Sequence, residues 1–274
     1  GCNWPARRIE SARKLCKRAA EADKLDLRFM IAVVVPVLNE AENIRALIGE
    51  IVAASAHAPI REIVYVDDGS TDDTLKLLEA EMRSVPMLRV VRHDRPMGQS
   101  AAFLSGGRAA SQDILAFIDG DLQNDPADIA LLFERYRTES AQNPKVAVLG
   151  QRAKRNDNTL RKISSRLANR IRAAVLNDGT RDTGCSLKLI RREDFLGLPY
   201  FDHMHRFLPA MLLRNGVRLT HVQVSHRARM HGSSKYGFWN RALVGATDLM
   251  GAAWLARRRL PADYKPTEVR ADPK

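Results

Sequence analysis

Two aspartates separated by one small residue, Asp119 and Asp121, are the side chains in this sequence best suited to carry chemistry. They follow an apolar run, Ile114 to Ile118, that predicts a buried strand. Carboxylate oxygens at this spacing could bind one hard divalent cation, which would in turn hold the phosphates of a ligand. The alternative interpretation is that Asp and Gly only end the strand and that the following Asn-Asp-Pro begins a turn.

Polar residues also follow two earlier predicted strands. The pairs are Asn39 with Glu40, after the strand at 31–37, and Asp67 with Asp68, after the strand at 60–66. A third strand at 87–91 and a helix at 100–110 precede the strand that leads to Asp119. These strand–helix units predict an α/β fold with a single doubly wound, mostly parallel sheet flanked by helices. Ligands of such sheets bind outside the carboxyl ends of the strands, where all three polar clusters are expected.

Before the third strand, we expect Ser70 or Thr71 to cap the helix that leads to it.

Beyond residue 127 the alternation of strands and helices becomes less regular. The later elements are predicted as helices at 127–137, 161–176, 207–213 and 238–259, and as strands at 146–149, 186–190 and 218–225.

The charge balance indicates an acidic partner. The 274 residues contain 44 Lys and Arg against 32 Asp and Glu, a formal charge of +12. This excess suits phosphate ligands, anionic lipid or nucleic acid. Cys2, Cys16 and Cys185 show no metal-type spacing, which favours a reduced, cytoplasmic setting. No run approaches the roughly 20 apolar residues of a membrane-spanning helix, and residues 1–28 lack the apolar core of a secretory signal.

Six motifs, in this order, resemble the inverting GT-A glycosyltransferases of family 2, and among them the dolichol- and polyprenyl-phosphate sugar synthases. The motifs are Val35-Pro36-Val37-Leu38-Asn39-Glu40, Val66-Asp67-Asp68-Gly69-Ser70, Gly98-Gln99-Ser100, Asp119-Gly120-Asp121-Leu122-Gln123, Gly150-Gln151-Arg152 and Arg229-Met230-His231-Gly232-Ser233-Ser234-Lys235. The resemblance covers about residues 30–240 and implies a GT-A fold. Gln99 departs from the basic residue that is common there, which bears on how the donor's phosphates are contacted.

The resemblance implies a donor site for a UDP- or GDP-linked sugar. Pro36, Asn39 and Glu40 would line the base and ribose, and Asp68 would read one of the two. Asp119, Asp121 and Gln123 would hold Mg²⁺ or Mn²⁺ against the donor's diphosphate, with Asp119 also contacting the donor. From the residues alone, Gln123 is an ordinary polar loop residue.

The resemblance also implies polyprenyl phosphate as the acceptor. A phosphate monoester, with a second pKa near 6, is largely ionised at neutral pH and needs no general base to attack the sugar. Its phosphate would be held by basic and hydroxyl side chains, namely Arg152, Arg161, Ser165 (or Ser164), Arg229, Ser234 and Lys235. Asp119, Asp121 and Arg152 are then the expected catalytic residues. Asp182, His205 and Arg206 would lie near them. Each basic residue taken singly is also explained as a solvated surface charge.

The sequence patterns and the resemblance together divide the chain into segments. We expect an N-terminal extension at 1–29, a catalytic domain at 30–237, an amphipathic helix at 238–260 and a disordered tail at 261–274. The domain would have a nucleotide-binding half at 30–125 and an acceptor half at 126–237. Trp and Arg in the amphipathic helix suit an anionic membrane surface, which would place the protein on the inner face of the cytoplasmic membrane. The alternative is a helix that packs on the domain or forms a homo-oligomer contact.

Three other functions compete with this interpretation. One is a family 2 glycosyltransferase with a glycan, protein or other lipid acceptor. A nucleotidyltransferase would carry a Gly-rich basic loop after its first strand, where this chain has Pro-Val-Leu-Asn-Glu. A nucleic-acid-binding module would explain the net charge but not the polar clusters at one sheet edge, so no nucleic-acid partner is expected.

Overall fold

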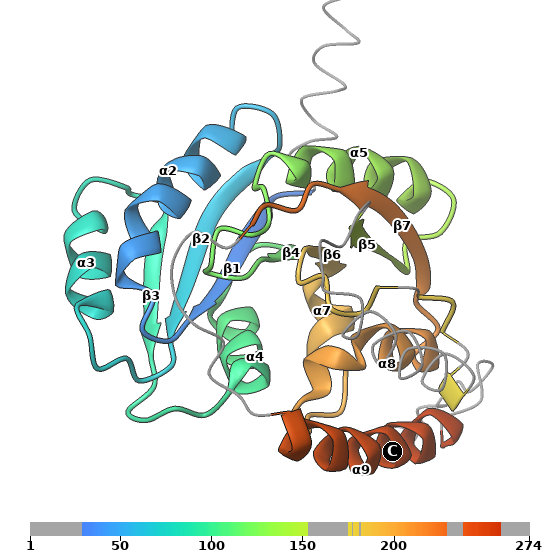
Figure 1. Ribbon diagram of the computed structural model, residues 1–274. Helices are drawn as coiled ribbons and strands as arrows, with labels where there is room; N and C mark the ends of the chain where they lie inside the picture. The colour runs from blue at the N-terminus through green and yellow to red at the C-terminus, as the bar shows by residue number, and fades with distance from the viewer. Residues whose placement is uncertain (1–28, 153–174, 177, 181, 229–237, 259–274) are drawn as a thin grey trace, which may run out of the picture.

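A seven-stranded sheet forms the centre of the molecule (Figure 1). The computed structural model describes residues 29–152, 175–176, 178–180, 182–228 and 238–258. The strand order is β3-β2-β1-β4-β6-β5-β7. The strands are β1 (Ile31–Val37), β2 (Ile60–Asp67), β3 (Leu88–Arg92), β4 (Ile114–Phe117), β5 (Val146–Arg152), β6 (Lys188–Arg191) and β7 (Arg218–Val224).

The sheet is mostly parallel, as the sequence predicts. β1 pairs in parallel with β2 and β4, β2 with β3, and β5 with β7. Within the described residues, only β6 runs antiparallel, and it does so to both β4 and β5. The register pairs Val37 with Asp67 and Val34 with Phe117. The carboxyl ends of β1, β2 and β4 therefore meet at one edge, where the predicted polar residues emerge.

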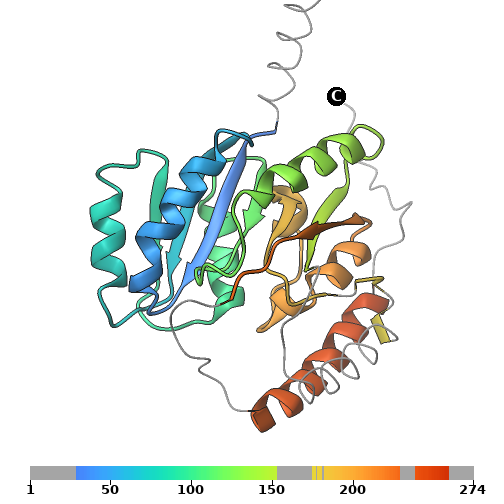
Figure 2. The ribbon, with the colours of Figure 1, turned by 45° about the horizontal axis from the view of Figure 1, so that its top comes forward.

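Helices cover both faces of the sheet (Figure 2). One face carries α2 (Ile44–Ala54), α3 (Thr74–Glu81) and α5 (Asp128–Ser140), and the other carries α4 (Gln99–Ala109), α7 (Arg192–Leu196) and α8 (Leu208–Arg214). The described residues also form two 3₁₀ turns, η1 (Ala41–Asn43) and η2 (Met204–Arg206). In β1, Ile31, Val33 and Val35 pack in one core, while Ala32 and Val34 pack in the other. Burial on both faces explains why β1 reads as a continuous apolar run.

Helix α9 (Phe238–Arg257) lies outside α8, at the bottom of Figure 1. Ala252 is fully buried against the core, and Leu249 packs beside it. The Arg214 guanidinium donates to the carbonyl oxygens of Leu255 and Arg258, at 2.8 and 2.7 Å, and so satisfies the C-terminal end of the helix. One face of α9 therefore packs on the domain. Among the described helices, none combines the length and the apolar character that crossing a membrane requires.

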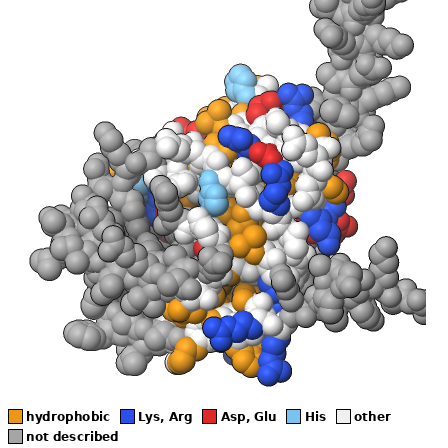
Figure 3. Space-filling model, turned by 90° about the vertical axis from the view of Figure 1, so that its right-hand side faces the viewer, with side chains coloured by type: hydrophobic (Ala, Val, Ile, Leu, Met, Phe, Trp, Pro, Cys, Tyr) orange, Lys and Arg blue, Asp and Glu red, His pale blue; other side chains and the backbone are white. Residues whose placement is uncertain are grey.

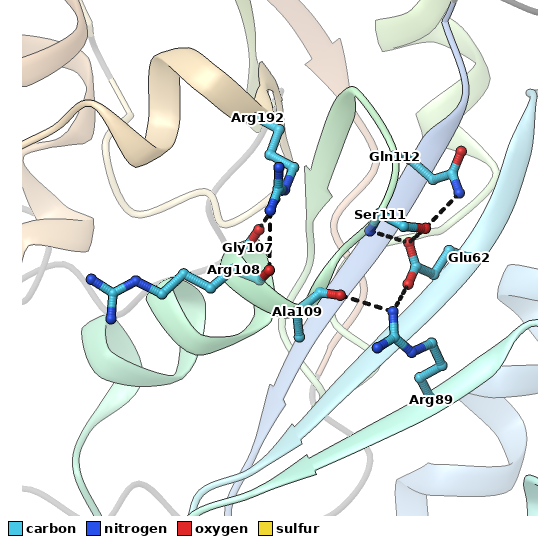
Figure 4. A network of polar contacts seen from close by, with 8 residues as sticks. All are labelled: Glu62, Arg89, Gly107, Arg108, Ala109, Ser111, Gln112 and Arg192. Carbon is cyan, nitrogen blue, oxygen red and sulfur yellow. Dashed lines mark hydrogen bonds and ion pairs between the residues drawn. The ribbon is translucent and has the colours of Figure 1, made fainter.

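The amino-terminal edge of the sheet is fixed by a buried carboxylate (Figure 4). Glu62 of β2 accepts hydrogen bonds from the Arg89 guanidinium and from the backbone N–H and hydroxyl of Ser111, the latter two at 2.7 and 2.9 Å. Arg89 also donates to the Ala109 carbonyl oxygen at 2.8 Å. This network connects β2, β3 and the end of α4 at the edge opposite to the polar clusters.

Some local predictions differ from the structure. The predicted cap at Ser70 or Thr71 is wrong, because α3 begins at Thr74 and Asp72 Oδ1 accepts the Thr74 N–H at 3.0 Å. Ser70 Oγ instead accepts the N–H of Asn39 at 2.9 Å. The strand predicted at 186–190 begins at residue 188. Nearly all of the extension predicted at 1–29 and of the helix predicted at 161–176 lies outside the described residues, as does the tail from 261.

Candidate active site

The loop after β4 places Asp119 and Asp121 against the end of β1. A Cβ on Gly120 would lie 2.5 Å from Val37 Cγ1 and 3.2 Å from the Pro36 carbonyl oxygen. Only glycine therefore allows the loop to pass this close to β1. Both aspartates are held at the carboxyl edge of the sheet, and Asp121 is 7% exposed.

The negative charge of Asp121 disfavours the charged form of Asp119. Burial, followed by the negative charge of Asp121, raises the pKa of Asp119 to about 6, although Ser186, Lys188 and Arg152 act in the opposite direction. A divalent cation between these oxygens would relieve that repulsion, so the pair fits a metal site of the Mg²⁺ or Mn²⁺ class. Within the described ranges, no three His, Cys, Asp or Glu side chains form a metal-binding group by themselves. Further ligands would have to come from other side chains or from a substrate.

Polar side chains around Asp119 fix its position. Gln99 Nε2 donates to Asp119 Oδ1 at 2.7 Å, and the Asp119 N–H donates to Ser186 Oγ at 3.2 Å. The Ser186 hydroxyl donates to Asn124 Oδ1 at 2.8 Å. Gln99, which departs from the basic residue that the motif suggests, thus contacts Asp119 through an uncharged donor.

A buried lysine, Lys188, lies beside the same site and was missed by the sequence analysis. Lys188 is 5% exposed and donates to the carbonyl oxygen of Cys185. Burial lowers the pKa of its ammonium group, while the charges of Cys185, Asp119 and Asp182 act to raise it. The available signal was the alternation of Ser186 and Lys188 with Leu187 and Leu189 in an otherwise apolar strand.

The residues expected to line the nucleotide connect two loops. The Asn39 Oδ1 accepts the N–H of Thr71 at 2.8 Å, with Asn39 in the left-handed conformation at φ 55°. The Glu40 N–H donates to Thr74 Oγ1 at 2.9 Å, and the Glu40 carboxylate accepts from the Asn43 amide at 2.7 Å. Pro36 lies half-buried in β1, opposite Val66. These contacts hold the loops after β1 and β2 together at the site edge.

Asp68 organises the loop that leads into α4. Its Oδ1 accepts the Met97 N–H at 2.8 Å and lies 2.7 Å from His93 Nδ1, and its Oδ2 accepts the Gly98 N–H at 2.8 Å. The His93 Nε2 lies 2.8 Å from Ser105 Oγ. Asp68 is 4% exposed. The observed contacts of Asp68 are thus structural, and its expected role in reading the base or ribose stays a prediction.

Arg152, at the end of β5, is paired with Asp182. Arg152 Nε and Nη2 donate to the two carboxylate oxygens of Asp182, both at 2.7 Å. The side chains are 12% and 9% exposed. This fork-to-fork geometry fixes the guanidinium plane at the carboxyl edge of the sheet.

The chain after β7 returns to the aspartate loop. The Arg227 N–H donates to the carbonyl oxygen of Gln123 at 2.8 Å. The Arg227 guanidinium also contacts Glu50 and Asp125. The basic motif that begins at Arg229 therefore follows directly on a segment bound to the aspartate loop. Some predicted acceptor residues lie outside the described residues, namely Arg161, Ser165, Arg229, Ser234 and Lys235.

Comparison with known proteins identifies the family. Residues 32–197 match the family described as glycosyl transferase family 2. The chain belongs to this family. This glycosyltransferase is 36% identical to dodecaprenyl-phosphate galacturonate synthase of Rhizobium johnstonii over 234 residues. The aligned region covers 83% of this chain and 67% of the relative. It is also 31% identical to undecaprenyl-phosphate 4-deoxy-4-formamido-L-arabinose transferase of Yersinia pestis over 208 residues. That aligned region covers 75% of this chain and 62% of the relative.

The fold of this glycosyltransferase is shared with solved structures. Glucosyl-3-phosphoglycerate synthase from Mycobacterium tuberculosis, in complex with Mn²⁺, UDP-glucose and phosphoglyceric acid, superposes with a TM-score of 0.64 at 19% identity. The match covers 89% of this chain and 85% of the other. The predicted fold class, the family and the prediction of a glycosyltransferase are confirmed.

The exposed side of α9 carries a separate apolar hollow. It has a volume of about 660 Å³ and shares no residue with the aspartate site. Its lining residues are Val175, Leu249, Met250, Ala253, Trp254, Arg257 and Arg258. Viewed from the side where α9 ends, hydrophobic and basic side chains lie next to each other at the bottom of the molecule (Figure 3).

Proposed function

We propose that this glycosyltransferase transfers a sugar from a nucleotide-diphosphate sugar to polyprenyl phosphate, with inversion at the anomeric carbon. The observation that carries the proposal is the identity of 36% and 31% to two enzymes named for prenyl-phosphate sugar transfer. The geometry supports it, because the paired aspartates and Arg152 with Asp182 lie at the same sheet edge.

On the donor side, Asp119 and Asp121, with Gln123, would hold Mg²⁺ or Mn²⁺. When bound, the cation supplies Lewis-acid neutralisation of the charge that develops on the leaving diphosphate. Gln99 keeps Asp119 in place through its 2.7 Å hydrogen bond. Pro36 of β1 and the connected loops that contain Asn39, Glu40 and Asp68 would surround the nucleoside of a UDP- or GDP-linked donor.

On the acceptor side, a phosphate oxygen would attack the anomeric carbon while the bond to the diphosphate breaks on the opposite face. The acceptor is already ionised, so no side chain has to remove a proton. Arg152, held in plane by Asp182, would orient the acceptor phosphate. The remaining acceptor-phosphate residues in this proposal are Arg161, Ser165, Arg229, Ser234 and Lys235.

The exposed face of α9 would contact an anionic membrane surface, where a prenyl phosphate resides. Met250 and Trp254 are 65% and 56% exposed, and the Arg258 guanidinium lies 4.6 Å from the Trp254 ring centre. Aromatic and basic side chains together suit the boundary between head groups and acyl chains, with each basic charge contributing about 1 kcal/mol. Flotation with anionic and neutral vesicles tests this. Binding to anionic vesicles that Trp254→Ala and Arg257→Glu weaken is expected, and equal flotation with both vesicle types would contradict it.

An acceptor panel tests the proposed function. The chain is incubated with UDP- and GDP-linked sugars, galacturonate among them, in Mn²⁺ or Mg²⁺, and products are identified by mass. The acceptors are a short prenyl phosphate, the matching prenol, diacylglycerol, an oligosaccharide and 3-phosphoglycerate. We expect product only with the prenyl phosphate. Transfer to the prenol at a similar rate would remove the role assigned to the phosphate, and transfer only to another acceptor would refute the proposal.

A further inference from the structure

Three polar contacts, joined by short stretches of chain, connect α9 with the carboxylate of Asp119. Gln99, the first residue of α4, donates to Asp119 at 2.7 Å. The next residue, Ser100, contacts His205 of η2. On the same turn, His203 Nδ1 lies 3.0 Å from Asp248 Oδ2 of α9. The segment 203–206 therefore lies between the first turn of α4 and the middle of α9.

The contact between α4 and η2 is tight and directional. Ser100 is 1% exposed, and its Oγ accepts the backbone N–H of His205 at 3.2 Å and lies 2.8 Å from His205 Nδ1. Because Oγ already accepts one N–H, its own hydrogen is available for Nδ1 of a neutral imidazole. Two bonds thus fix the first turn of α4, and Gln99 shares that turn. A shift of residue 205 would move Gln99 relative to Asp119.

The backbone at His203 depends on its partners. His203 has φ 60°, a left-handed conformation that costs a non-glycine residue roughly 1 kcal/mol or more. The conformation is supported by the His203 N–H, which donates to Asp202 Oδ1 at 2.8 Å, and by the contact of the imidazole with Asp248. Asp248 therefore helps to hold a strained turn against α4.

We propose that Asp248 is a positioning residue for the metal and donor site. Its hydrogen bond with His203 holds segment 203–206 against Ser100 and so keeps Gln99 in hydrogen-bonding position on Asp119. This inference rests on the proposed function, since the cation is the group that Asp119 would bind. It makes α9 part of the framework of the catalytic site, and not only a helix that contacts the membrane.

Mn²⁺ binding to the full metal-free chain tests the inference, with free Mn²⁺ followed by electron paramagnetic resonance. Asp248→Ala is expected to weaken Mn²⁺ affinity by roughly threefold to tenfold and to raise the donor KM. Asp248→Asn, whose amide oxygen still accepts from an imidazole N–H, should restore most of the affinity. Gly251→Ala is the matched control, because this exposed position on α9 has no atom within 4 Å of an added Cβ.

A double-mutant comparison separates positioning from a general loss of stability. Gln99→Ala alone should weaken Mn²⁺ binding by about tenfold, and adding Asp248→Ala should weaken it little further, because both act on the same contact. Ser100→Ala provides a second variant if Asp248→Ala unfolds, and it should weaken binding similarly. Unchanged Mn²⁺ affinity in a folded Asp248→Ala or Ser100→Ala variant would overturn this inference alone. Absence of Mn²⁺ binding by the wild type would overturn the metal assignment as well.

Discussion

Arg152 and Asp182 form a bidentate ion pair, with both N–O distances at 2.7 Å, at the edge where the acceptor phosphate is proposed to bind. Removing Arg152 would leave a nearly buried carboxylate without this partner. We expect Arg152→Ala to lower the free energy of unfolding by about 3 kcal/mol and to raise the KM for prenyl phosphate. Arg137→Ala, which breaks the exposed ion pair with Glu134, should lower the free energy of unfolding by less than about 1 kcal/mol. Equal losses in urea denaturation of the two variants would contradict this account.

The buried Glu62 network should contribute stability without affecting catalysis. Burial alone raises the pKa of Glu62, but hydrogen bonds from Ser111 and Arg89 outweigh it and hold the pKa below 4.5. Its contribution is therefore complete above about pH 4.5 and is lost as the pH falls through the lower folded pKa. Glu62→Ala should cost about 3 kcal/mol at pH 7, measured by urea denaturation. The kcat of the folded variant should stay unchanged, and a large kcat loss would mean that this edge is coupled to the site.

His205 should make the protein sensitive to acid. Burial, followed by the charges of Arg206, Lys188 and His203, lowers the pKa of His205 to about 3. The unfolded chain takes up this proton below about pH 6.5, whereas the folded chain does not until about pH 3. The free energy of unfolding should fall over that interval. Between pH 7 and 4.5, the free energy of unfolding of His205→Asn should therefore fall less than that of the wild type. The control His57→Asn, at an exposed position, should show the same pH dependence of unfolding as the wild type. An identical pH profile for His205→Asn and the wild type would refute this role.

Gly120 should be required for both stability and metal affinity. Alanine would place Cβ 2.5 Å from Val37 Cγ1, so the loop that carries both aspartates would have to move. We expect Gly120→Ala to cost about 1–3 kcal/mol and to weaken Mn²⁺ binding in calorimetry. Gly49→Ala, an exposed helical position with no atom within 4 Å of the added Cβ, should instead stabilise by about 0.5 kcal/mol. Wild-type metal affinity in Gly120→Ala would show that the loop tolerates the shift.

Much of the fold was predictable because its signals are local. The apolar runs of β1, β2 and β4 and the polar residues at their ends are contiguous in sequence, and the parallel-sheet rule places those ends together. The sequence pattern did not show which side of α9 is buried and which is exposed. Its sequence suits a membrane surface, and only its packing on α8 and the contact of Arg214 show that one face is covered.

Contacts between distant segments account for what the sequence analysis missed. Ser186 and Lys188 reach Asp119 only because β6 inserts antiparallel next to β4, an arrangement that no local pattern indicates. The same holds for Ser100 with His205, which are 105 residues apart. The family resemblance implied nucleotide contact for Asp68, whereas its three contacts, with two backbone N–H groups and one imidazole of the 93–98 loop, depend on tertiary structure.

Transfer by the wild type and Asp121→Asn, each assayed with and without Mn²⁺, tests the central claim most directly. Product is measured by mass with one nucleotide-sugar and a short prenyl phosphate. The wild type should form the sugar–prenyl phosphate only with the metal, and chelation should stop it. Asp121→Asn should remain folded and lose at least about 100-fold in rate, because an amide replaces a charged ligand. Undiminished transfer by Asp121→Asn, or full wild-type activity after chelation, would contradict the metal-dependent mechanism.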